Sequence, residues 1–135
     1  MPRELFSNRF VNASVDDSRR IALFTRSDRP FSQLEELHDA YGALVRISAS
    51  LDRKSLGLLI DLRDAPARND PAFEQAMSKY RGPMMQGYQR VALLVKTVTG
   101  KLQVSRHALE DRTAVLVTQD ANEAMAFLAG QQPKK

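Results

Sequence analysis

The sequence of 135 residues contains no cysteine. This absence excludes disulfide bonds, thiolate nucleophiles and the cysteine-rich sites that hold zinc or iron–sulfur clusters. Histidine occurs only at His38 and His107, and no third ligand stands in register with them to complete a zinc site. We therefore expect neither a metal nor a cofactor.

Long apolar runs are also absent. The longest, LGLLI at 56–60 and VALLV at 91–95, are far shorter than the ~20 residues that a membrane-spanning helix needs. The first ten residues, MPRELFSNRF, have neither the apolar stretch nor the small-residue cleavage site of a secretory signal. We expect a cytoplasmic protein without a membrane span.

A strong charge of one sign is lacking as well. The formal net charge is +4, but acidic residues are interleaved with basic ones along most of the chain. A phosphate-binding surface needs its cations gathered on one face or stripe. We therefore do not expect nucleic acid to be the partner.

The length suits a single domain, 1–135, with a core over about 5–130 and a flexible tail at 131–135. Alternating residues, a DDS turn and a second β-prone run predict a hairpin. Three further apolar runs alternate with helical patterns, so the predicted fold class is α/β: a mixed sheet of about five strands in the order β-β-α-β-α-β-α-β-α. Strands are expected at 10–15, 20–25, 56–62, 91–95 and 114–117, and helices after Ser32, Asp70, Gly100 and Asp120.

The segment from Leu56 to Phe73 joins a strand that is apolar on both faces to a charged loop and a helix that starts with proline. Ligands of open α/β sheets bind outside the carboxyl ends of the strands. Side chains at the ends of this strand and the next are therefore the predicted ligand or partner site: Arg63, Asp64, Arg68, Asn69, Lys96 and Thr97. The alternative reading is structural, with Asp61, Asp64 and Asp70 pairing with these cations or capping the helix.

Catalytic motifs are missing from the sequence. Lys96 to Lys101 lacks the first glycine and the final hydroxyl of a phosphate-binding loop, and no G-x-S-x-G nucleophile motif is present. A phosphoacceptor domain would need an acidic pair after an early strand, and Ile21 to Arg26 has none. We expect no catalytic residues and a protein that is not an enzyme.

Gly82 and Pro83 are expected to break or kink the second helix. Helical spacing of Met84, Met85 and Tyr88 is typical of a core. If these three side chains lie beyond the break, they instead form an exposed apolar patch for a partner or a second subunit.

The element order, the length and the DLR strand end at 61–63 together resemble the STAS-like domains of anti-sigma-factor antagonists, in particular the broad, largely uncharacterised bacterial branch of that family. The resemblance covers about Leu5 to Leu128. It implies a non-enzymatic, partner-binding protein whose docking surface includes the helix after Asp70. In the antagonists a serine in this loop is phosphorylated, but no serine stands between Leu56 and Ser78 here.

These observations predict a regulatory or protein-interaction module, with a protein partner or a second copy of the chain bound at the carboxyl edge. The alternative is a carrier or sensor that binds an anionic or amphipathic small molecule at the same edge.

Overall fold

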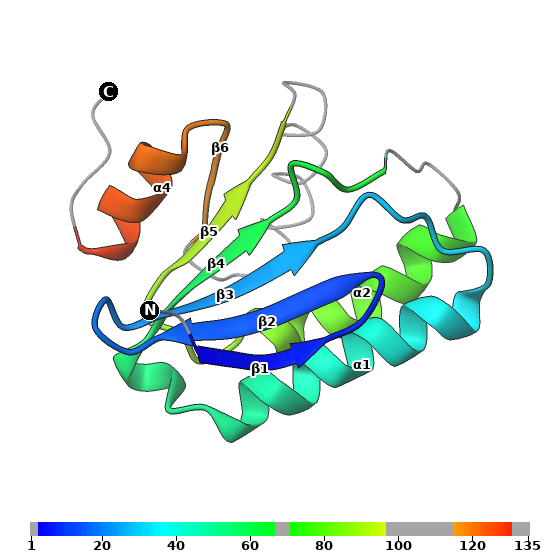
Figure 1. Cartoon of the computed structure of the whole chain (residues 1–135), viewed down its shortest axis with the longest axis horizontal. Coiled ribbons are helices and arrows are strands. Elements are labelled where there is room, and N and C mark those ends of the chain that lie inside the picture. The colour runs from blue at the N-terminus through cyan, green and yellow to red at the C-terminus, as the bar shows by residue number, and fades with distance from the viewer. Residues whose placement is uncertain (1–2, 67–70, 97–114, 131–135) are drawn as a thin grey trace.

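The computed structural model describes residues 3–66, 71–96 and 115–130, which form one six-stranded sheet with helices on both faces (Figure 1). The strands are β1 (Arg3–Ser7), β2 (Val11–Asp16), β3 (Ile21–Arg26), β4 (Gly57–Asp61), β5 (Val91–Leu94) and β6 (Val115–Thr118). The helices are α1 (Leu34–Ser50), the short 3-10 helix η1 (Arg53–Ser55), α2 (Pro71–Met85) and α4 (Ala121–Leu128).

The spatial order of the strands follows the chain, β1-β2-β3-β4-β5-β6. The first three strands are antiparallel, and β3 to β6 are parallel. In the parallel part Thr25, Asp61, Leu94 and Thr118 lie side by side in register. The ends of β3 to β6 therefore meet at one edge of the sheet, which we call the carboxyl edge.

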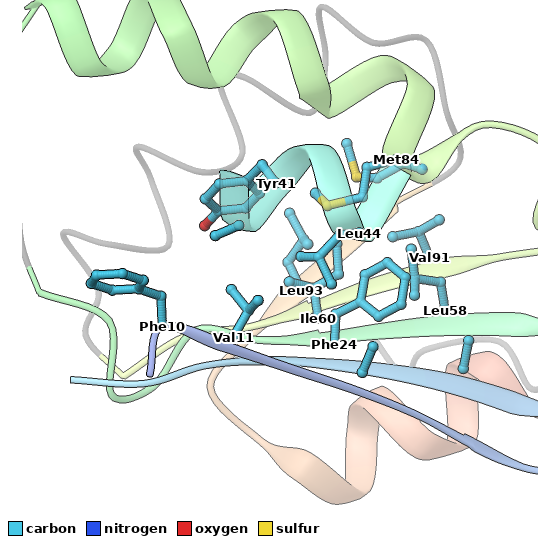
Figure 2. Packing of buried hydrophobic residues seen from close by; sticks show 14 of the residues in the cluster. Phe10, Val11, Phe24, Tyr41, Leu44, Leu58, Ile60, Met84, Val91 and Leu93 are labelled. Carbon is cyan, nitrogen blue, oxygen red and sulfur yellow. The ribbon is translucent and has the colours of Figure 1, made fainter. Parts of the chain in front are cut away.

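Helices α1 and α2 pack together on one face of the sheet, and α4 covers β4, β5 and β6 on the other (Figure 1). The larger core cluster lies between the sheet and the α1–α2 pair, with side chains such as Phe24, Leu44 and Ile60 interlocked (Figure 2). The smaller cluster holds α4 against the sheet through Ala124 and Leu128. Because both faces are covered, every side chain of β5 is buried, as the doubly apolar run predicted.

Helix starts agree with the sequence to within a residue. Asp120 caps α4 by accepting hydrogen bonds from the backbone N–H groups of Asn122 and Glu123. Helix α1 has Gln33, not Ser32, at its cap position, and the Glu36 carboxylate accepts hydrogen bonds from the backbone N–H groups of both. Pro71 opens α2 as predicted, whereas its expected cap, Asp70, and the helix expected after Gly100 lie outside the described residues.

Strand β1 was not predicted. Its five residues, RELFS, form the free edge of the sheet and pair with β2 across a register shift between Glu4 and Phe6. This irregularity removes the strict alternation by which a strand is found in a sequence. The sheet consequently has six strands instead of about five.

The predicted break at Gly82-Pro83 was wrong, because α2 continues to Met85 with Pro83 inside its last turn. A proline near a helix end removes few backbone hydrogen bonds, and the Pro83 ring is exposed. The continued helix turns Met84 and Met85 inward. These residues and Tyr88 are 4%, 1% and 7% exposed, so they belong to the core and do not form an exposed apolar patch.

Candidate binding edge at the carboxyl end of the sheet

Strand β4 ends in a charged turn at the carboxyl edge. Arg63 donates from Nε to Asp61 Oδ1 at 3.1 Å and from Nη2 to Asp61 Oδ2 at 2.8 Å, and its backbone N–H also bonds Asp61 Oδ1 at 3.1 Å. The turn is closed by the Ala65 N–H, which donates to the Leu62 carbonyl at 3.1 Å. Two parallel hydrogen bonds fix the plane of the guanidinium, so Arg63 is held in one orientation.

The Asp61–Arg63 pair is only partly shielded from water. The Asp61 side chain is 17% exposed and the Arg63 side chain is 49% exposed. Burial acts to raise the pKa of Asp61, but the hydrogen bonds and charge of Arg63 outweigh it and hold that pKa below its usual value. The hydrogen bond to Asp61 in turn raises the pKa of Arg63.

Lys96 lies at the same edge, directly after β5, and its side chain is exposed. Its backbone carbonyl accepts a hydrogen bond from Gln119 Nε2 at 3.0 Å, and the Val95 N–H donates to the Thr118 carbonyl at 2.9 Å. These bonds tie the ends of β5 and β6 together. Within the described ranges no acidic group forms an ion pair with Lys96.

The structure thus places Arg63, Asp64 and Lys96 at one edge, the first two at the end of β4 and the third at the end of β5. The other three predicted site residues, Arg68, Asn69 and Thr97, lie outside the described residues. The alternative prediction, that acidic residues at this edge pair with its cations, is confirmed for Asp61, which pairs with Arg63.

One charged residue at this edge was missed by the sequence reasoning. Arg26 ends β3 and is only 6% exposed, with its guanidinium 4.2 Å from the centre of the Phe31 ring. Arg26 stands at the carboxyl end of an apolar strand, much as Arg63 does, and this position in the sequence could have indicated it. The sequence pattern did not indicate that this cation would be buried.

A hollow of about 520 Å³ lies away from this edge, between the start of β1 and the end of α1. Its charged groups already bond to neighbours: Arg3 pairs with Asp17 at 3.3 Å, and Asp52 accepts a hydrogen bond from Ser55 at 3.0 Å. Because these charged groups are already paired with neighbours, we place the candidate site at the carboxyl edge.

The described surface is poor in apolar groups, since Leu34 is the one large hydrophobic residue there that counts as exposed. No cluster of three potential metal ligands occurs among the described residues. None of the described helices combines the length and the apolar character needed to cross a membrane.

Comparison with known proteins identifies the fold. Neither a protein-family model nor a curated protein matches the chain. A solved structure that resembles it is that of an uncharacterised protein of the DUF3478 family, with a SpoIIAA-like fold, from Shewanella loihica PV-4. The two chains are 14% identical with a TM-score of 0.60, and the match covers 92% of this chain and 98% of the other. The protein therefore has the SpoIIAA-like, STAS-like fold, which confirms the class expected from the element order.

Proposed function

We propose that the chain is a non-enzymatic regulatory or scaffolding module that binds a protein partner through the carboxyl edge of its sheet. The observation that carries the proposal is the Arg63 side chain, half exposed yet held rigidly by Asp61. Asp64 beside it and Lys96 just after β5 give the edge charges of both signs. The SpoIIAA-like fold supports this reading as an analogy of fold.

Such an edge suits a partner that presents a carboxylate opposite Arg63. The guanidinium uses Nε and Nη2 toward Asp61, and its remaining N–H groups are available to a second acceptor. Because the Asp61 pair already orients the fork, less side-chain entropy is lost on binding. The stretch from Leu56 to Ser78 has no serine between its ends, so we propose a contact that does not depend on serine phosphorylation in this loop.

The test begins by identifying the partner with a photo-crosslinking residue at position 64 and, as control, at position 35 on the exposed side of α1. The affinity of the captured partner is then measured for Arg63→Glu, Lys96→Glu and the control Arg46→Glu, whose side chain is exposed on α1. We expect each edge variant to bind at least tenfold more weakly, since charge reversal opposes an acidic partner. Unchanged affinity in both edge variants, with folding intact, would refute the proposal.

A second candidate function is the binding of a small anionic or amphipathic molecule at the same edge. It is favoured by Lys96, whose exposed ammonium has no acidic partner in the described residues. A thermal-shift screen of phosphates, carboxylates and acyl chains should then find a stabilising ligand, and Lys96→Ala should abolish its effect. If no compound stabilises the protein, or if the stabilisation is the same in Lys96→Ala, this second function is contradicted.

A further inference from the structure

The opposite edge of the sheet, where β3 to β6 begin, carries cations without an acidic partner. This amino edge also includes the turn between β2 and β3, the end of α1 and η1 (Figure 1). Three cations there form no ion pair within the described residues: Arg20 in the turn, and Arg53 and Lys54 in η1. The Gly57 N–H donates to the Arg20 carbonyl at 3.0 Å, so the turn lies directly beside the residues that follow η1.

Arg20 holds an unfavourable backbone conformation. Among the described residues other than glycine, Arg20 alone has a positive φ, +58°. A residue with a Cβ adopts this left-handed conformation at an energetic cost, and glycine is the residue that such turn positions favour. The Arg20 side chain is exposed, so packing in the core does not account for an arginine here. A strained residue on an exposed turn indicates that its side chain serves a purpose other than folding.

The hollow of about 520 Å³ between β1 and α1 lies at this same edge, and Ser55, the residue after Lys54, is part of its wall. Its volume falls within the range of about 300–1,000 Å³ that is typical of binding pockets. Its charged groups are engaged, Arg3 with Asp17 and Asp52 with Ser55. What the hollow offers a partner is therefore its apolar wall, formed by Leu5, Val15, Ile47, Leu51 and Leu56.

We propose that the amino edge is a docking surface for an acidic segment of a protein partner, which places a bulky apolar side chain in the hollow and carboxylates opposite Arg20, Arg53 and Lys54. An apolar anchor in a pocket, surrounded by polar contacts, is the arrangement found at binding hot spots. The cations stand on two segments outside the hollow, so several carboxylates on one chain complement them better than a single head group does. Asp52 and the paired acids of the β2–β3 turn lie among these cations, which disfavours the continuous phosphate charge of a nucleic acid. This surface is separate from the carboxyl edge and does not depend on the function proposed above.

The experiment is a nuclear magnetic resonance titration of the isotope-labelled protein with the peptide Glu-Glu-Trp-Glu-Glu, blocked at both ends. The backbone amide signals of Arg20, Leu51 and Ser55 should shift together with one dissociation constant. Replacing the tryptophan of the peptide by serine should weaken binding about tenfold, and replacing its glutamates by lysines should abolish binding. Lys54→Glu should weaken binding about three- to fivefold, whereas the control Arg29→Glu, an exposed cation after β3, should leave it unchanged.

Arg20→Gly is the sharpest variant, because glycine removes the charge and relieves the left-handed conformation together. It should bind the peptide about threefold more weakly. Its melting temperature should equal or exceed that of wild type. A folding defect cannot produce this combination of weaker binding and undiminished stability.

Peptide-induced shifts that are absent, or that are confined to the amides of Arg63 and Lys96, would overturn the proposal. So would an affinity for the peptide that is unchanged in both Arg20→Gly and Lys54→Glu. A short thymidine oligonucleotide that binds the same amides more tightly than the peptide would overturn it in favour of a nucleic acid. Shifts at Arg20 and Ser55 that follow the concentration of the protein alone would overturn it in favour of a second copy of the chain.

Discussion

Replacement of Ser48 by alanine should destabilise the protein strongly although it removes one oxygen atom. Ser48 is fully buried in α1, and its hydroxyl donates to the Met84 carbonyl at 3.0 Å and shares a 2.8 Å hydrogen bond with the Tyr88 hydroxyl. Alanine leaves the buried Tyr88 hydroxyl and the Met84 carbonyl without this partner, and a buried unsatisfied group costs about 1–3 kcal/mol. We expect a loss of about 2 kcal/mol in the free energy of unfolding, equivalent to several degrees in the melting temperature.

Urea denaturation followed by circular dichroism measures this loss. Ser50→Ala is the matched control, because Ser50 also bonds a carbonyl, that of Ile47 at 2.7 Å, but is exposed. It should change stability by less than about 0.5 kcal/mol. Tyr88→Phe should cost about 1 kcal/mol, and the double variant with Ser48→Ala should cost less than the sum of the two. Equal effects of Ser48→Ala and Ser50→Ala would refute the buried network and the inward position of Tyr88.

Two further predictions concern the edge turn and two glycines. The lowered pKa of Asp61 means that its ion pair stabilises the fold above the pKa of the unfolded chain, near 4, and that this contribution disappears as the pH falls through the folded value. Wild type should exceed Asp61→Asn in stability by about 1 kcal/mol at pH 7, and urea denaturation should show this difference shrinking as the pH is lowered below about 4; a difference that does not shrink in acid would contradict the assignment. Gly87→Ala should cost about 1–2 kcal/mol, because Gly87 has a φ of +92° and a Cβ there would lie 3.3 Å from Arg53 Nε. At Gly82, within α2, an added Cβ would meet no neighbouring atom within 4 Å, so Gly82→Ala should instead raise the free energy of unfolding by about 0.5–1 kcal/mol. If the melting temperatures of the two glycine variants shift in the same direction, the reasoning from backbone conformation is wrong.

The elements that the sequence predicted best are those with local signals. The hairpin of β2 and β3 is confirmed, and its turn depends on Asp16, whose carboxylate accepts hydrogen bonds from the backbone N–H groups of Ser18 and Arg19. A turn residue and its partners lie within a few positions of one another, so their types indicate the structure. The course of α2 past Pro83 depended instead on packing of Met84 and Met85 into the core, which the local pattern does not contain.

The candidate site was predicted in part. Parallel strands that follow one another along the sheet must end at one edge, so Arg63 and Lys96 were expected together and are found at that edge. The sequence left open whether Arg63 is free for a ligand or pairs with an acidic residue such as Asp61. A sequence does not specify which rotamers neighbouring charged side chains adopt. Arg26 was missed because a charge after an apolar strand is ordinarily exposed.

The sequence by itself determined the α/β class, the order of most elements and the edge of the sheet at which charged side chains gather, because these follow from periodicity, caps and turns. Only the tertiary structure decided which of the charged side chains at this edge are buried and which are exposed. Arg26 and Arg63 both follow apolar strands, yet the first continues the helix-facing side of β3 beneath Phe31 and the second lies in an exposed turn. The difference arises from packing between segments far apart in the chain, which sets burial and thereby the energetic cost of each charge.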